Sequence, residues 1–151
     1  KSFEENTVLL FFGDHLPKVE DSFYNRINGG VTDSIEEQQL MHTIPFYIWA
    51  NYDILESKIE LTSLNYLSTY LLEAAGIEFP PYYSFLKDTE AIIPAINAYG
   101  YYSLSHQRYL PIAEADGKEA QALENYKIMQ HNNIFDKKNR SYTAFGAYMT
   151  K

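Results

Sequence analysis

This chain contains an unbroken apolar run, Val8–Phe12, which ends in Gly13-Asp14-His15. A run of β-branched, leucine and aromatic residues without polar alternation is typical of a strand buried on both faces, as in a parallel sheet. Ligands of open α/β sheets bind just beyond the carboxyl ends of such strands. Since glycine allows a sharp backbone turn, the run predicts a central strand that presents an acid and an imidazole at its end.

The composition and net charge of the chain limit the classes of partner that it can bind. The chain has 151 residues, the size of one ordinary domain, and 46% of them are hydrophobic, which is enough for a core. Acids outnumber bases 20 to 12, for a net charge of −8. This balance argues against nucleic acid and gives no polybasic motif for an anionic membrane surface. The chain has no cysteine, so disulfides and thiolate chemistry are excluded.

Hydrophobic periodicity predicts an α/β fold with a small sheet and several helices. The strands are expected near residues 7–12 and 44–50, and Pro45 suits the first position of the second strand. The clearest helices are expected at 63–75 and 118–132. The first of these has Thr62 or Ser63 as its N-cap and Gly76 as its αL terminator.

Weaker patterns complete the secondary structure. Residues 20–27 form a short helix, and Ser34 with Glu37 forms a capping box that starts another. Two further short helices are expected at 82–86 and 89–93, whereas residues 97–112 are expected to be mostly irregular. The segment 135–151 fits a loop, a short strand or a loose tail. No linker divides the chain, so residues 1–151 are treated as one unit.

Asp14 and His15 are candidate ligands of a divalent metal ion. Carboxylate oxygen and neutral imidazole nitrogen suit Mn²⁺, Zn²⁺ and Fe, and adjacent residues can reach one ion when they lie on a turn. The alternative is a histidine paired with a carboxylate on a surface loop. Two ligands do not complete a catalytic site, and His42, the histidine nearest to a strand, is not fixed near Asp14 by the sequence. No nucleophile with an adjacent base is evident.

The chain is rich in aromatic residues, with 14 Tyr and 9 Phe. They are densest at Tyr82-Tyr83 and at residues 99–102. Large amphipathic side chains at a rim or an interface are the ordinary interpretation. The alternative is a non-catalytic, tyrosine-rich binding module for sugars or lipid headgroups.

A strand buried on both faces needs neighbouring strands and elements that cover each face. The few residues that precede this strand cannot supply them. We therefore expect this chain to be a soluble C-terminal portion of a longer protein. On its own it should expose an apolar face or edge, or cover that face by self-association.

Several segments resemble one enzyme family. Residues 11–17 are similar to the Gly-Asp-His-Leu-Pro motif of the lipoteichoic acid synthase-like phosphoglycerol transferases, in the sulfatase-like branch of the alkaline phosphatase superfamily. Residues 43–52 resemble the family's Thr-Pro-Phe-aliphatic-aliphatic-Trp-x-Asn segment, with Ile44 inserted into the Thr-Pro step. Weaker similarity continues in the same order to about residue 136.

The resemblance implies a site, a reaction and a location. Asp14 and His15 would hold the catalytic ion, usually Mn²⁺, while the threonine nucleophile and an acidic ligand would lie upstream of residue 1. The parent enzyme would be anchored in a bacterial membrane with its catalytic domain outside the cell. It would transfer phosphoglycerol from a lipid phosphodiester headgroup in two steps, and this portion alone would be inactive.

Hydrolysis of a sulfate ester or phosphodiester remains an alternative within the same superfamily. Many superfamily members carry Asp-His-Gly at this point, whereas this chain carries Asp14-His15-Leu16-Pro17. That difference favours the transferase.

Overall fold

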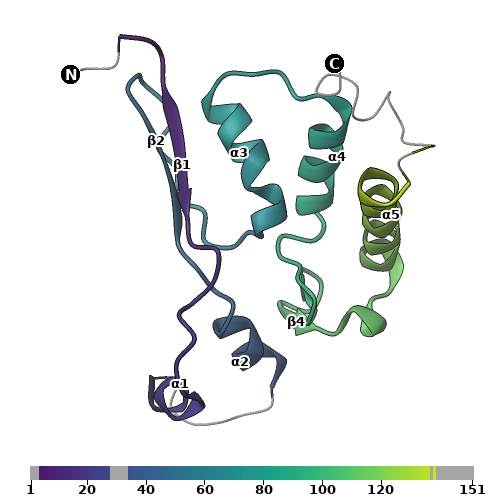
Figure 1. Cartoon of the computed structure of the whole chain (residues 1–151). Coiled ribbons are helices and arrows are strands. Elements are labelled where there is room, and N and C mark those ends of the chain that lie inside the picture. The colour runs from purple at the N-terminus through teal and green to yellow at the C-terminus, as the bar shows by residue number, and fades with distance from the viewer. Residues whose placement is uncertain (1–3, 28–33, 137, 139–151) are drawn as a thin grey trace.

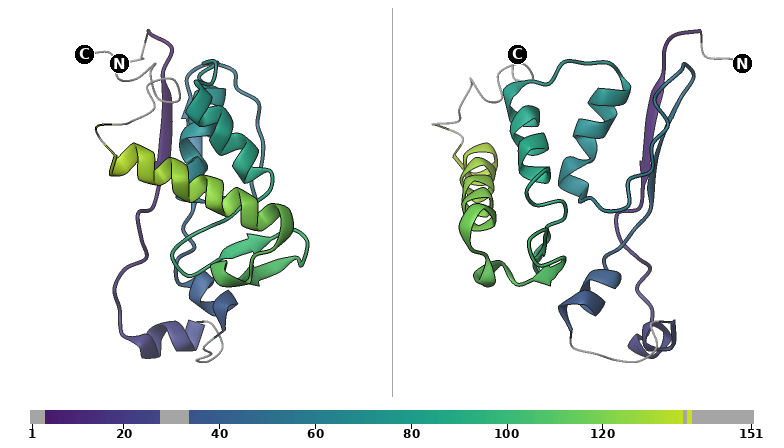
Figure 2. Two further views of the ribbon diagram at one scale, coloured as in Figure 1. Left: turned by 90° about the vertical axis from the view of Figure 1, so that its right-hand side faces the viewer. Right: turned by 180° about the vertical axis from the view of Figure 1, so that it is seen from behind.

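The computed structural model describes residues 4–27, 34–136 and 138. The order of elements is β1 (Val8–Phe12), α1 (Asp21–Ile27), α2 (Ile35–Leu40), β2 (Phe46–Ala50), η1 (Leu64–Tyr66), α3 (Leu67–Ala74), α4 (Pro81–Glu90), β3 (Tyr101–Ser103), β4 (Arg108–Leu110), η2 (Ile112–Glu114) and α5 (Gly117–Ile134). Figure 1 shows the β1–β2 sheet at one side, with α3, α4 and α5 following one another away from it. Figure 2 shows the same succession from behind. This arrangement confirms the predicted α/β class, with a small sheet packed with helices.

The β1–β2 sheet differs from the parallel sheet that the sequence predicts. β1 pairs with β2 in antiparallel register, from Val8 opposite Ala50 to Phe12 opposite Phe46. α3 packs on one face of this pair, where the Phe46 ring lies 6.1 Å from the ring of Tyr70. Within the described residues, no element covers the other face (Figure 1). The prediction of a parallel strand with both faces buried is therefore wrong for this chain.

The uncovered sheet face is apolar. Cross-strand neighbours alternate between the two faces, so Leu9 with Trp49 and Phe11 with Tyr47 share one of them. These side chains are 39%, 42%, 48% and 62% exposed, in that order, and the Phe11 and Tyr47 rings stack at 5.2 Å. The expected exposed apolar face is confirmed. Both faces of β1 are thus apolar, although α3 covers only one of them.

The buried core lies among α4, α5 and the β3–β4 hairpin. One cluster contains five buried residues, namely Ile93, Tyr101, Leu110, Ala122 and Leu123. A second cluster joins Tyr66, Leu86 and Tyr126, so it links η1, α4 and α5. The core is thus centred away from the sheet that carries Asp14 and His15.

The β3–β4 hairpin falls in a segment that was predicted to be mostly irregular. Tyr101 pairs with Leu110 and Ser103 pairs with Arg108, and Gln107 in the connecting turn has φ of 54°. Each strand has only three residues, which is too short for a clear alternating pattern. Tyr101 and Ser103 are fully buried, so one of the three tyrosines in residues 99–102 belongs to the core.

A buried carboxylate, Glu119, fixes this hairpin to α5. It is 6% exposed and accepts hydrogen bonds from the hydroxyls of Tyr101 and Ser103, the latter at 2.9 and 3.0 Å. The backbone N–H and the hydroxyl of Ser105 also donate to it. Burial alone would raise the pKa of Glu119, but these donors outweigh it and lower the pKa. Burial and the neighbouring Glu119 raise the pKa of Tyr101 to about 12.

The ends of α2 and α3 follow local rules, with one exception. Ser34 accepts a hydrogen bond from the N–H of Glu37 at 3.3 Å, as the capping box predicts. Gly76 has φ of +66° and terminates α3, as expected. Ser63 occupies the N-cap position of η1, which leads into α3, but its side chain makes no capping hydrogen bond. The hydroxyls of Thr62 and Ser63 bond instead to Glu90 and to the carbonyl of Ile96.

The later helices are more continuous than the sequence pattern suggests. The helix expected at 82–86 belongs to a longer helix, α4, which has Pro81 in its first turn and ends at Glu90. Of the helix expected at 89–93, only the first two residues lie in α4. The helix predicted at 118–132 is confirmed within α5. Most of segment 135–151 lies outside the described residues. In the described part of the chain, no helix is both long and apolar enough to cross a membrane.

Candidate functional site

The candidate site begins at the turn that ends β1. The Gly13 N–H donates to the carbonyl of Pro45 at 3.2 Å, so the turn is tied to the residue before β2. A Cβ atom at Gly13 would lie 3.3 Å from the Cβ of Ile44, a tight approach. Gly13 therefore lets the two chains run close together where Asp14 and His15 begin.

Asp14 and His15 point their ligand atoms toward each other. His15 Nδ1 lies 2.9 Å from the carbonyl oxygen of Leu16. Because a carbonyl can only accept, a hydrogen bond here needs the proton on Nδ1, and in the neutral imidazole this leaves the Nε2 lone pair for another partner. His15 Nε2 lies 3.4 Å from Asp14 Oδ2, and the other carboxylate oxygen accepts the His15 N–H at 2.9 Å. The side chains of His15 and Asp14 are 75% and 82% exposed.

This spacing fits two ligands of one metal ion. Ligand atoms about 2.1 Å from an ion lie about 3.0 Å apart at an octahedral angle and about 3.4 Å apart at a tetrahedral angle. The hydrogen bond from Nδ1 to a backbone carbonyl is the usual second contact of a metal-binding histidine. Among the described residues, no group of three or more His, Asp or Glu could hold an ion. The pair is therefore suited to a shared ion but supplies only part of a site.

The other histidines do not join this pair. His42 stacks on Tyr99, with ring centroids 4.6 Å apart. His106 lies 3.0 Å from the hydroxyls of Ser103 and Ser105 in the hairpin turn, and His131 contacts Phe135 near the end of α5. The side-chain geometry thus does not bring His42 together with Asp14 and His15.

Asp14 and His15 line a groove of about 1780 Å³. Its walls include the segment before and within β2, the loop from 52 to 65, and the turn that contains Tyr99. Tyr99 is 50% exposed, whereas Tyr101 is fully buried. The tyrosine-rich segment singled out in the sequence is therefore divided between the core and this groove. Its overall density was visible in the sequence, but which rings face the groove was not.

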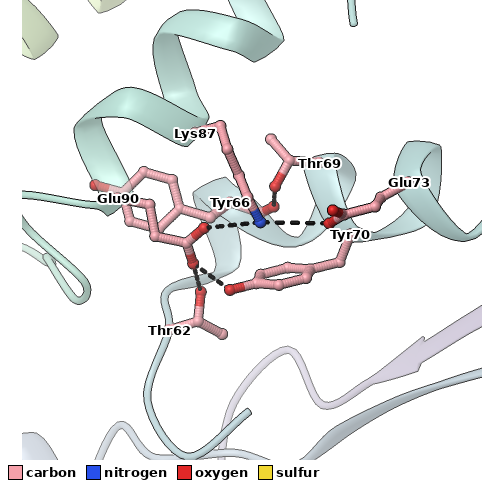
Figure 3. Close-up of polar contacts among 7 residues, drawn as sticks. All are labelled: Thr62, Tyr66, Thr69, Tyr70, Glu73, Lys87 and Glu90. Atoms are coloured by element: carbon pink, nitrogen blue, oxygen red, sulfur yellow. Dashed lines mark hydrogen bonds and ion pairs between the residues drawn. The ribbon is translucent and has the colours of Figure 1, made fainter. Parts of the chain in front are cut away.

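One wall of the groove is held by a polar cluster between α3 and α4 (Figure 3). Glu90 is 8% exposed and accepts hydrogen bonds from the hydroxyls of Thr62 and Tyr70, both at 2.6 Å. Lys87 Nζ lies 3.8 Å from Glu90 and 3.3 Å from Glu73, and 4.3 Å from the centroid of the Tyr70 ring. Burial and the Glu90 carboxylate raise the pKa of Tyr70, so its hydroxyl remains a donor at neutral pH.

We expect Glu90→Ala to lower the free energy of unfolding by about 2 kcal/mol, because two partly buried hydroxyls lose their acceptor. Urea unfolding of the chain followed by circular dichroism would measure this change. Glu73→Ala is the matched control, because its side chain is 60% exposed and its pair with Lys87 should contribute less than about 1 kcal/mol. Equal losses in the two variants would contradict a structural role for the buried carboxylate.

Comparison with known proteins identifies the family. A family described as Sulfatase matches residues 2–77, half of the chain, and this segment includes Asp14, His15, both strands of the β1–β2 sheet and α3. A protein of Rhizobium meliloti (strain 1021), named "Putative cyclic beta-1,2-glucan modification protein", is 25% identical over 153 residues. That alignment covers 91% of this chain but only 22% of the relative. No solved structure matches. The chain belongs to the sulfatase family.

Proposed function

We propose that the protein carrying this chain transfers phosphoglycerol from a lipid phosphodiester headgroup to a hydroxyl of a glucan. The observation that carries the proposal is the pair Asp14 Oδ2 and His15 Nε2, 3.4 Å apart at the end of β1, inside the segment that matches the sulfatase family. The Asp-His-Leu-Pro sequence resembles the phosphoglycerol transferases. The glucan acceptor is suggested by the name of the Rhizobium relative.

Asp14 and His15 would bind a divalent ion, with Mn²⁺ as our proposal. Superfamily members are typically metal-dependent. When bound, such an ion neutralises charge on phosphoryl oxygens and lowers the pKa of a hydroxyl nucleophile. Asp14 would supply negative charge, and His15 would supply a neutral nitrogen whose ring is oriented by the carbonyl of Leu16. Neither residue is required to move a proton.

The rest of the active site would come from elsewhere in the protein. The chain spans about a fifth of the length of the relative that it matches. We propose that the preceding part supplies the threonine nucleophile, the remaining metal ligands and the membrane anchor, and that the catalytic domain faces outward. The same part would cover the apolar face formed by Leu9, Phe11, Tyr47 and Trp49. In the chain alone, self-association could cover this face instead.

A second candidate is hydrolysis of a sulfate ester or phosphodiester, which is favoured by the description of the matching family. The two reactions differ in product. The full-length protein would be incubated with Mn²⁺, a phosphoglycerol lipid and a cyclic β-1,2-glucan, and in parallel with an aryl sulfate. We expect a phosphodiester signal on the glucan by ³¹P NMR. Sulfate release without glucan modification would overturn the transferase proposal.

A further inference from the structure

An exposed ring pair lies in the groove beside the candidate metal ligands. The rings of His42 and Tyr99 stack with centroids 4.6 Å apart and planes 18° apart, and both residues line the groove. Both are exposed, Tyr99 to 50%. An exposed aromatic face in a concave site is the surface on which the C–H face of a sugar ring stacks, while nearby polar groups bond its hydroxyls.

The turn that presents Tyr99 is fixed by its neighbours. Asn97 Oδ1 accepts hydrogen bonds from the N–H groups of Tyr99 at 2.9 Å and Gly100 at 3.3 Å. The Asn97 side chain also exchanges two hydrogen bonds with Gln39, which is 7% exposed on α2. A Cβ atom at Gly100 would collide with the backbone of β4 and with Ile35. The backbone that carries the ring is therefore held in place before any ligand arrives, which reduces the entropy lost on binding.

The ring pair lies within reach of the candidate metal ligands. Gly13, the neighbour of Asp14, is hydrogen-bonded to the carbonyl of Pro45. His42 is three residues before Pro45, and three residues span at most about 11 Å. A saccharide of a few units that stacks on Tyr99 can therefore extend one hydroxyl toward Asp14 and His15.

The charges of the groove favour a neutral ligand. Of the described residues, two lysines line it, and both are paired with carboxylates: Lys58 with Glu60 at 2.7 Å, and Lys87 with Glu73 at 3.3 Å. Asp53 and Glu56 add further negative charge to its lining. No unpaired lysine is thus available in the described groove to attract an anionic acceptor, whereas an unmodified glucan is neutral.

We propose that the His42–Tyr99 pair is the acceptor subsite, on which a sugar ring of a neutral glucan stacks. The choice of ligand rests on the proposed function. The sequence singled out residues 99–102 as a whole. The structure restricts the proposal to Tyr99, because Tyr101 is buried and Tyr102 packs edge-on against Tyr109.

The test is a titration of the chain with cyclic β-1,2-glucan, followed by calorimetry and by NMR shifts of the tyrosine rings. We expect Tyr99→Ala to weaken binding about tenfold, the upper end of what one aromatic contact contributes. Tyr99→Phe keeps the ring and should bind as the unmodified chain does. Phe135→Ala is the matched control, since Phe135 is 71% exposed and also contacts a histidine, His131, but does not line the groove.

Two results would overturn the subsite: no glucan binding by the unmodified chain, or equal binding by Tyr99→Ala. A Tyr99→Ala variant that loses its circular dichroism spectrum would be replaced by His42→Ala, which should weaken binding as well. Failure of the proposed function has a different signature. In that case glucan binding depends on Tyr99, but the full-length protein does not attach phosphoglycerol to the glucan.

Discussion

Asp14→Asn should lower the transfer activity of the full-length protein by at least about a hundredfold, because removing a metal ligand should cost at least as much as losing one of its supporting contacts. The substitution keeps the size of the side chain and removes its negative charge. Asp14 is 82% exposed at its side chain, so the fold should be unaffected. Activity would be measured as phosphoglycerol transferred to glucan at several Mn²⁺ concentrations.

The control for this experiment is Asp53→Asn, the same chemical change at another carboxylate that lines the groove. It should leave activity within about twofold if Asp14 acts as a ligand and not merely through the charge of the groove. Similar losses in the two variants would contradict a specific role for Asp14.

Glu119→Ala should cause the largest loss of stability among the substitutions considered, about 3 kcal/mol in the free energy of unfolding. It removes a buried acceptor and leaves the fully buried hydroxyls of Tyr101 and Ser103 without it. Thermal and urea unfolding of the chain would measure the loss. Glu124→Ala is the control on the same helix, because its side chain is 56% exposed and its pair with Lys127 should contribute little.

Glu119 should also make stability depend on pH. Its folded pKa lies below its ordinary value of 4.5, so the folded state favours the ionised form. Its contribution is fully present above pH 4.5 and is lost as the pH falls through the lowered pKa. Glu119→Gln should remove this part of the acid dependence. An unchanged difference in stability between pH 5 and pH 3 in that variant would contradict the assignment.

Local rules predicted much of the fold. The N-cap at Ser34, the αL glycine at Gly76 and the helix expected at 118–132 each depend on near neighbours in sequence, and each was found. Prediction failed where residues distant in sequence determine the hydrogen-bond partner of a side chain. Thr62 or Ser63 was expected to cap a helix with its side chain. Their hydroxyls instead donate hydrogen bonds to Glu90 and to the carbonyl of Ile96, about thirty residues away in sequence.

The β1–β2 sheet also shows that local sequence does not determine contacts between distant residues. The apolar run Val8–Phe12 was correctly predicted to be a strand. An unbroken apolar run does not determine whether the neighbouring strand is parallel or antiparallel, or how many faces of the strand are covered. The candidate pair Asp14 and His15 comes from the sequence because a glycine and two adjacent possible ligands are a local signal, and its binding of a metal ion stays a prediction. The groove was not, because it needs Tyr99 and His42, which are 57 residues apart, to meet at one place.

We propose that Asp14 and His15 hold a divalent ion in the protein that carries this chain. The most direct measurement is pulsed electron paramagnetic resonance of the full-length protein loaded with Mn²⁺, which detects a nitrogen coordinated to the ion. If His15 is a ligand, a nitrogen coupling is present, is lost in His15→Ala and is kept in His131→Ala, the matched change on α5. A nitrogen coupling that persists unchanged in His15→Ala would contradict the claim.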